Sequence, residues 1–219
     1  MEPIPTESIV RAVVAANLEG RWLLDHPFYR RWEAGQLSEA ELASYAGQYR
    51  HVERALPGVL ADIALGLEEG PARVLVEATL SDERGNPRSH VALFDDFARA
   101  VGAADDPPAP ATAALIGLQT DRARRDARAG LATVAAYEVQ AAEVASSKAD
   151  GLRRHYRLGP EGTRFWDVHA ALEAEHADWS LAALAELVEH PGDLAEPLRR
   201  SADAWWAFLD ERQALAPVG

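Results

Sequence analysis

The chain contains no cysteine. This absence excludes disulfide bonds, a thiolate nucleophile, and any zinc or iron–sulfur site that is held by cysteine. A metal ion in this protein would therefore have to be bound by histidine and carboxylate side chains. That set of ligands favours iron or manganese, and it also permits zinc.

Positive charge and long apolar segments are also scarce. The 219 residues include 22 lysines and arginines against 35 aspartates and glutamates, which gives a net charge of −13. Such a charge argues against nucleic acid or an anionic membrane as the main partner. No apolar run approaches the roughly 20 residues of a membrane span, and the first residues lack the pattern of a secretion signal. We therefore expect a cytoplasmic protein that binds neither nucleic acid nor membrane.

Helix-forming residues, by contrast, are abundant. Ala, Leu, Glu and Arg dominate the sequence, and few stretches are rich in β-branched residues. The hydrophobic content of 48% is ordinary for a globular protein, and 219 residues are enough for one domain with its own core. The one clear linker, at 104–112, is too short to require a domain boundary. We expect a single all-α domain over residues 1–219.

Capping residues, glycines and prolines predict where the helices begin and end. Ser38 and Glu41 form an S-x-x-E capping box at the start of a long helix, in which Pro57 should introduce a kink or a break. Gly130 should separate two later helices. The predicted helices cover about residues 6–17, 21–34, 38–67, 72–82, 89–101, 113–129, 131–157, 160–189 and 193–215. Seven or more helices with short connections form a helical bundle.

The most informative pattern lies within residues 165–179. His169, Glu173 and His176 are spaced i, i+4 and i+7, so on a helix they point to one side, within roughly 60° of each other. A side that simply faced a core would be apolar. Two imidazoles and one carboxylate on one side of a helix are instead a typical set of ligands for a transition metal. The alternative is one core histidine with two solvated neighbours.

Other ligand candidates lie in separate segments. Glu138 is surrounded by small or apolar residues, where a carboxylate is costly unless it binds a metal or forms a salt bridge with an arginine. Gly85 and Pro87 break the chain between Glu83 and His90, so we expect one helix to end at Glu83 and the next to open at His90, both pointing inward. The alternative is a solvated loop acid and a surface histidine. The remaining histidines should be structural or solvated: His26, His51, His155 and His190.

Residues 26–57, 78–102, 135–152 and 165–177 resemble the helical superfamily of TenA, the PQQ-synthesis proteins and haem oxygenase, over roughly 20–190 in all. Within it, the haem-oxygenase-like diiron oxidases carry Glu, a His seven residues later, Glu, and then His-x3-Asp/Glu-x2-His. Each position is filled here, in order and spacing, by Glu83, His90, Glu138, His169, Glu173 and His176. Glu173 stands where many members of the family have Asp. The resemblance implies two iron ions, or a manganese–iron pair, that react with dioxygen and a reductant.

Within that family the sequence is similar to the para-aminobenzoate synthase branch, known from a chlamydial protein that associates with death domains. Three tyrosines and a lysine of that branch are matched by Tyr29, Tyr45, Tyr137 and Lys148, the last being the only lysine in the chain. A further tyrosine of that branch is replaced by Phe165. This likeness implies that the enzyme consumes itself, with Tyr29 as the source of the aromatic ring and Lys148 as the amino donor. The alternatives are that Tyr29 is an aromatic anchor near Trp32 and that Lys148 is a solvated charge.

Other functions stay open on the sequence alone. A diiron oxidase of this kind could act on an external fatty acid or amino acid. A metal-free oxidoreductase of the PQQ-synthesis kind would take up no metal, and a non-enzymatic interaction protein would have no internal cavity near Glu138. Thiaminase activity of the TenA kind is excluded because it needs a cysteine nucleophile. The family also implies a homodimer.

Overall fold

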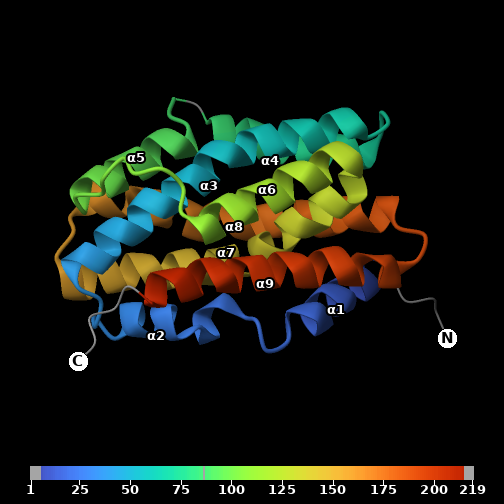
Figure 1. The fold of residues 1–219 in the computed structure, drawn as a ribbon. Helices are drawn as coiled ribbons and strands as arrows, with labels where there is room; N and C mark the ends of the chain where they lie inside the picture. Colours follow the sequence, from blue (N-terminus) through green and yellow to red (C-terminus); the bar gives the residue numbers. More distant parts are fainter. Residues whose placement is uncertain (1–5, 86, 215–219) are drawn as a thin grey trace.

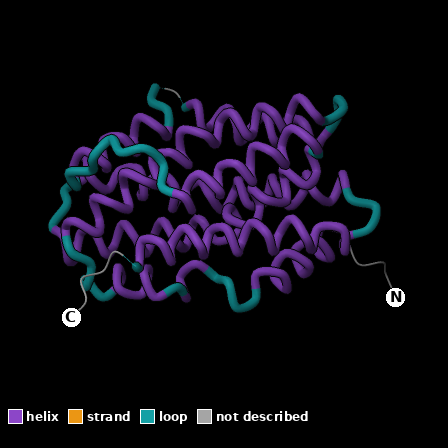
Figure 2. Tube along the Cα trace, viewed as in Figure 1, coloured by secondary structure: helices purple, strands orange, loops and turns teal. Residues whose placement is uncertain are grey.

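The computed structural model describes residues 6–85 and 87–214, and this part of the chain is almost entirely helical (Figures 1 and 2). It contains no strand, which confirms the predicted all-α class. The helices are α1 (Thr6–Leu18), α2 (Pro27–Glu33), α3 (Glu39–Gly66), α4 (Pro71–Arg84), α5 (His90–Ala100), α6 (Pro110–Arg125), α7 (Ala127–Tyr156), α8 (Pro160–Leu187) and α9 (Ala195–Gln213), with short 3-10 helices η1 (Leu23–Asp25) and η2 (Pro191–Leu194).

Helices α7 and α8 pack against each other along their length and form the middle of the bundle. Around them, α4 and α5 contact α8, while α3, α6 and α9 contact α7. Figure 1 shows α1 and α2 along one side of the molecule next to α9, with α4 and α5 on the opposite side. The inner faces of α4, α5, α7 and α8 are therefore directed toward a common interior. In the described part of the chain, no helix is both long and apolar enough to cross a membrane.

The start of α3 follows the prediction, and its middle departs from it. Ser38 and Glu41 form the predicted capping box, since each side chain reaches the backbone of the other. Pro57, however, does not divide the helix, which continues to Gly66, so the break, one of the two outcomes expected at Pro57, is wrong. A proline costs one backbone hydrogen bond there, and the buried Val59 and Leu60 that follow hold the chain in the helix through their packing.

Three other predicted boundaries are wrong. The stretch at 21–34 is split into η1 and α2, because the residue before Pro27 is restricted to extended backbone and His26 adopts it. Gly130 lies inside α7, which begins after the N-cap residue Asp126. A Cβ atom at Gly130 would lie 2.6 Å from Ala123 Cα, so glycine serves here for close approach of α6 and α7. The last helix begins at 195 instead of 193, and its predicted end at 215 falls outside the described residues.

The interior contains two groups of buried side chains. One is aliphatic and is built mainly by α1, the second half of α3, α4, α7 and α8. The other, the aromatic cluster, contains Phe28, Tyr29, Trp32, Tyr45, Tyr49, Phe94, Phe97, Phe165, Trp166, Trp205 and Phe208. Several buried acids and histidines of α3, α4, α5, α7 and α8 add a polar group to this interior.

Candidate metal centre

The three polar residues of α8 lie on one buried side of that helix. His169, Glu173 and His176 expose 5%, 4% and 1% of their surface. His169 Nε2 lies 3.4 Å from Glu173 Oε1, and His176 Nδ1 lies 3.8 Å from Glu173 Oε2. The interpretation as one core histidine with two solvated neighbours is therefore wrong.

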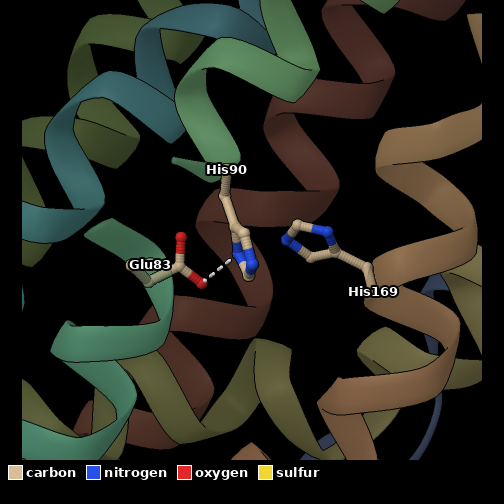
Figure 3. A group of neighbouring side chains, drawn as sticks. All are labelled: Glu83, His90 and His169. Atoms are coloured by element: carbon tan, nitrogen blue, oxygen red, sulfur yellow. Dashed lines mark ion pairs between the residues drawn. The ribbon is translucent and has the colours of Figure 1, made fainter. Parts of the chain in front are cut away.

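Glu83 and His90 meet across the joint between α4 and α5. Glu83 lies in the last turn of α4, and His90 is the first residue of α5, after its N-cap residue Ser89. Gly85 turns the chain with a φ of 61°, and a Cβ atom there would lie 1.9 Å from the carbonyl oxygen of Arg88. This turn brings Glu83 Oε1 to within 3.0 Å of His90 Nδ1 (Figure 3). Both side chains are buried, so neither is the solvated residue of the alternative interpretation.

Five of the six predicted ligands converge in two groups, in each of which the donor atoms are close enough to share one metal ion. In one group, donor atoms of Glu83, His90 and His169 all lie within 4.8 Å of one another, and in the second those of Glu83, Glu173 and His176 do so. Figure 3 shows His90 and His169 directed toward the same space from two helices. Since Glu83 belongs to both groups, its carboxylate lies between two positions at which a cation could bind.

Glu138, the sixth predicted ligand, lies beside these groups but belongs to neither. It is buried on α7, and its carboxylate accepts a hydrogen bond from Ser180 instead of pairing with an arginine. It lines a cavity of about 30 Å3 together with Glu83, His169 and Glu173. Burial raises the pKa of Glu138 to about 8, an effect that the hydrogen bond from Ser180 opposes and the negative charge of Glu83 reinforces.

Burial dominates the electrostatics of the site. Burial, followed by the charges of Glu83 and Glu138, raises the pKa of Glu173 well above its usual range. Burial lowers the pKa of His169 to about 3. Burial alone would raise the pKa of Glu83, but contact with His90 outweighs it and the pKa is lowered. The other oxygen of Glu83, Oε2, is buried and has no hydrogen-bond partner. Deprotonated acids and imidazole nitrogens are the ligand types that suit a divalent transition metal, and such an ion would stabilise the ionised form of these buried acids.

Two further contacts orient the imidazoles. His176 Nε2 lies 3.2 Å from Asp82 Oδ2, and His169 Nδ1 lies 2.9 Å from the carbonyl oxygen of Phe165. Each contact leaves the other ring nitrogen directed toward Glu173, as is usual for histidines that bind metals. Asp82 was not predicted from the sequence, and the only signal for it is its position directly before Glu83.

Lys148 and two tyrosines form a hydrogen-bonded group in the interior. Lys148 exposes 1% of its surface, and its Nζ lies 2.7 Å from Tyr29 Oη and 2.5 Å from Tyr45 Oη. The two tyrosine oxygens are 2.8 Å apart. Burial lowers the pKa of Lys148 well below its usual range, which favours a neutral amine. The solvated charge of the alternative interpretation is therefore wrong.

A second tyrosine pair joins this group to the acidic cavity. Tyr49 donates a hydrogen bond of 2.5 Å to Tyr137, and both residues line the cavity that contains Glu138. The Tyr49 ring also packs against Tyr45, with ring centroids 5.4 Å apart. Tyr49 was missed in the sequence, although it follows Tyr45 by one helical turn. Phe165, which replaces a tyrosine, packs against His169 with ring centroids 3.8 Å apart.

A second residue of this cavity, Glu53, was also missed. It lies on α3 one turn after Tyr49, exposes 4% of its surface, and lines the same cavity as Glu83 and Glu138. The four remaining histidines lie outside the two groups of possible ligands. His26 is buried and caps α2, and the other three contact backbone or solvent: His51, His155 and His190.

A surface groove of about 930 Å3 reaches the site from outside. It is lined by residues of α3, α4, α5 and α8 and extends to His90 and Asp82. Its apolar lining includes Leu80 and Leu93. Four arginines also line it: Arg73, Arg84, Arg88 and Arg164.

The sequence is similar to those of known redox enzymes and 4-aminobenzoate synthases. A family model for iron-containing redox enzymes matches residues 43–209. A 4-aminobenzoate synthase of Nitrosomonas europaea is 32% identical over 216 residues, which covers 90% of this chain and 88% of that protein. A 4-aminobenzoate synthase of Chlamydia pneumoniae is 28% identical over 202 residues, which covers 88% of this chain and 90% of that protein.

Comparison with solved structures supports the fold. A CADD-like protein of unknown function from Nostoc punctiforme superposes with a TM-score of 0.80 at 17% identity, covering 97% of this chain and 99% of the other. A TenA homologue from Pseudomonas syringae gives a TM-score of 0.78 at 16% identity, covering 95% of this chain and 92% of the other. These likenesses confirm the TenA-like and haem-oxygenase-like helical fold.

Proposed function

The chain belongs to the family of iron-containing redox enzymes with a haem-oxygenase-like fold, and we propose that its buried centre holds two iron ions, or a manganese–iron pair. The ligands would be Glu83, His90, Glu138, His169, Glu173 and His176. The observation that carries this proposal is that Glu83 belongs to both groups of converging donor atoms, as a carboxylate between two ions would. Glu138 would complete the set from α7.

The bound metals would supply the chemistry of dioxygen reduction, with electrons from a reductant. The chain would supply the rest of the site. Asp82 and the Phe165 carbonyl would hold the imidazoles in place, and the aromatic cluster would exclude water from the reacting groups. The turn at Gly85 would allow Glu83 and His90 to engage together as metal is loaded.

Metal analysis tests the centre. Protein expressed with added iron should carry two metal ions per chain, and the double variant His169→Ala/His176→Ala should lose them. His190→Ala is a suitable control because His190 is exposed. A double variant with the same metal content as the wild type would contradict this ligand assignment and favour the metal-free oxidoreductase.

We further propose that the enzyme acts as a 4-aminobenzoate synthase on its own side chains, with Tyr29 as the source of the ring and Lys148 as the amino donor. Two observations support this: the buried contact between Lys148 and Tyr29, and the relatives named 4-aminobenzoate synthase. Tyr45 completes the hydrogen-bonded group around the amine. Since Phe165 lacks a phenol, the tyrosines that connect the cavity at Glu138 to Tyr29 would be Tyr137, Tyr49 and Tyr45.

Substitution of Lys148 tests this reading. Lys148→Arg keeps a long basic side chain but removes the transferable amine, so it should bind metal and form no aminobenzoate. A Lys148→Arg protein that makes as much aminobenzoate as the wild type would eliminate the self-consuming reaction. Metal content measured on the same sample distinguishes loss of the amine from loss of the centre.

The groove supports a second candidate, an oxidase acting on an external fatty acid or amino acid. Its arginines would attract a carboxylate, and its apolar lining leads to His90. A self-consuming enzyme forms at most one product per chain, whereas an oxidase with an external substrate turns over repeatedly. Product formed per chain under excess dioxygen and reductant therefore decides between the two.

The quaternary structure and location also belong to this proposal. The family resemblance favours a homodimer, and a cytoplasmic location is what we expect from the sequence. Size-exclusion chromatography with light scattering would measure the oligomeric state. A mass of one chain, 23.8 kDa, would contradict the dimer.

A further inference from the structure

Glu53 is a buried acid that the proposed ligand set does not use. It lies on α3, exposes 4% of its surface, and its Oε2 atom is buried without a hydrogen-bond partner. Within residues 6–85 and 87–214, no arginine, lysine or histidine lies within 4.0 Å of its carboxylate oxygens. Burying an unpaired carboxylate is costly, so this side chain lowers the stability of the metal-free protein unless it has another role.

The position of Glu53 indicates that role. It lines the cavity of about 30 Å3 together with Glu83, Glu138, His169 and Glu173, so α3 contributes a fourth carboxylate to a space that already contains three. The cavity has room for a particle of about the size of a water molecule. Burial, followed by the charge of Glu83, raises the pKa of Glu53 well above its usual range, and these effects outweigh Lys148 and a contact with Tyr49, which act to lower it.

The charge of the site supplies the reason for a fourth carboxylate. Two divalent cations carry four positive charges, and Glu83, Glu138 and Glu173 carry three negative ones. We propose that Glu53 is a fourth carboxylate of the metal centre, which balances the remaining positive charge of the two ions in this buried cavity. This inference rests on the proposed function, because it requires a pair of metal ions.

A different role for Glu53 would be that of a structural counter-ion for Lys148. The two roles differ in their effect on the metal-free protein. A counter-ion stabilises the fold whether or not metal is present, so its removal lowers the melting temperature. A carboxylate whose role is to bind the metals does not stabilise the metal-free protein. Neutralising it therefore leaves the melting temperature of the metal-free protein unchanged or raises it.

Manganese binding to the metal-free protein tests the inference. Free Mn(II) is counted by electron paramagnetic resonance during a titration of the wild type, of Glu53→Gln and of the control Glu143→Gln, whose side chain is exposed on α7. Melting temperatures are measured without and with manganese. The wild type and Glu143→Gln should bind two ions, whereas Glu53→Gln should bind the second at least tenfold more weakly and melt no lower without metal.

Two results would overturn the inference while leaving the proposed function intact. One is Glu53→Gln binding both ions as tightly as the wild type. The other is a Glu53→Gln protein that melts lower without metal, as a structural counter-ion predicts. A wild type that binds no manganese or iron at all would overturn the proposed function and this inference together.

Discussion

Lys148 Nζ and Tyr29 Oη are in contact, 2.7 Å apart, inside the bundle. Both side chains are almost completely buried, and both pKa values are shifted by burial toward the neutral form. A neutral amine next to a neutral phenol costs much less to bury than an ammonium ion would. This contact places an amino group against an aromatic ring close to a candidate redox centre, and it is the basis of the proposed self-consuming reaction.

The contact predicts which tyrosine is essential. The chain has five tyrosines, and only Tyr156 lies outside the buried group; its Oη accepts a hydrogen bond from the backbone of Leu37. Tyr29→Phe should abolish aminobenzoate formation, with a loss of at least 100-fold, because the reacting phenol is removed. Tyr156→Phe should keep most of it. Product assayed by mass spectrometry from equal amounts of iron-loaded protein checks this, and a Tyr29→Phe protein with wild-type yield would contradict the role of Tyr29.

The joint between α4 and α5 gives a second prediction. Gly85→Ala forces an unfavourable φ of 61° and a clash of the new Cβ with the carbonyl oxygen of Arg88. Relief of that clash should separate Glu83 from His90 and weaken metal binding at least tenfold. Gly20→Ala is the control, since its φ is 72° but nothing lies within 4 Å of the added Cβ. Each change should cost about 1 kcal/mol or more of unfolding free energy. Equal metal affinity in the two variants would contradict the role of the joint.

The buried acids predict how stability depends on pH in the metal-free protein. Burial raises the pKa of Glu138 from 4.5 to about 8, so its favourable contribution is present below pH 4.5 and is lost as the pH rises toward 8. Burial lowers the pKa of His169 from 6.5 to about 3, so the contribution of His169 makes stability rise with pH, but only below pH 6.5. Between pH 6.5 and 8, therefore, the free energy of unfolding should fall.

The slope should be up to about 1.4 kcal/mol per pH unit for each proton involved. Glu138→Gln should reduce this slope, while Glu53 and Glu173 maintain part of it because their pKa values are also raised by burial. Denaturant unfolding at several pH values in the presence of a chelator measures the slope. A Glu138→Gln protein whose slope matches that of the control Glu143→Gln would show that Glu138 is ionised in the folded state.

Local signals in the sequence predicted much of the fold. The capping box of Ser38 and Glu41 is a contact between neighbours in the chain, so it could be found without tertiary information. Pro57 and Gly130 misled the prediction because their effect depends on packing. Buried neighbours keep the helix intact at Pro57, and Gly130 is required by the approach of α6, a helix that a local pattern does not reveal.

In the candidate site, too, some residues could be predicted from local spacing and others depend on packing. The spacing of His169, Glu173 and His176 fixed their common side on α8, and the structure places them together in the interior. Glu53 was missed because it is followed by Arg54 and lies near Arg50, which makes that part of α3 read as solvated. Whether this side of α3 faces the interior depends on the helices that pack against it.

The origin of the amino group tests the central claim most directly. Because Lys148 is the only lysine, protein produced with 15N-labelled lysine, at the side-chain nitrogen, carries this label at one position. After iron loading and reaction with dioxygen and a reductant, the aminobenzoate formed should be one mass unit heavier than that from unlabelled protein, and the peptide containing Lys148 should be altered. Unlabelled aminobenzoate from a chain whose Lys148 remains intact would contradict the account.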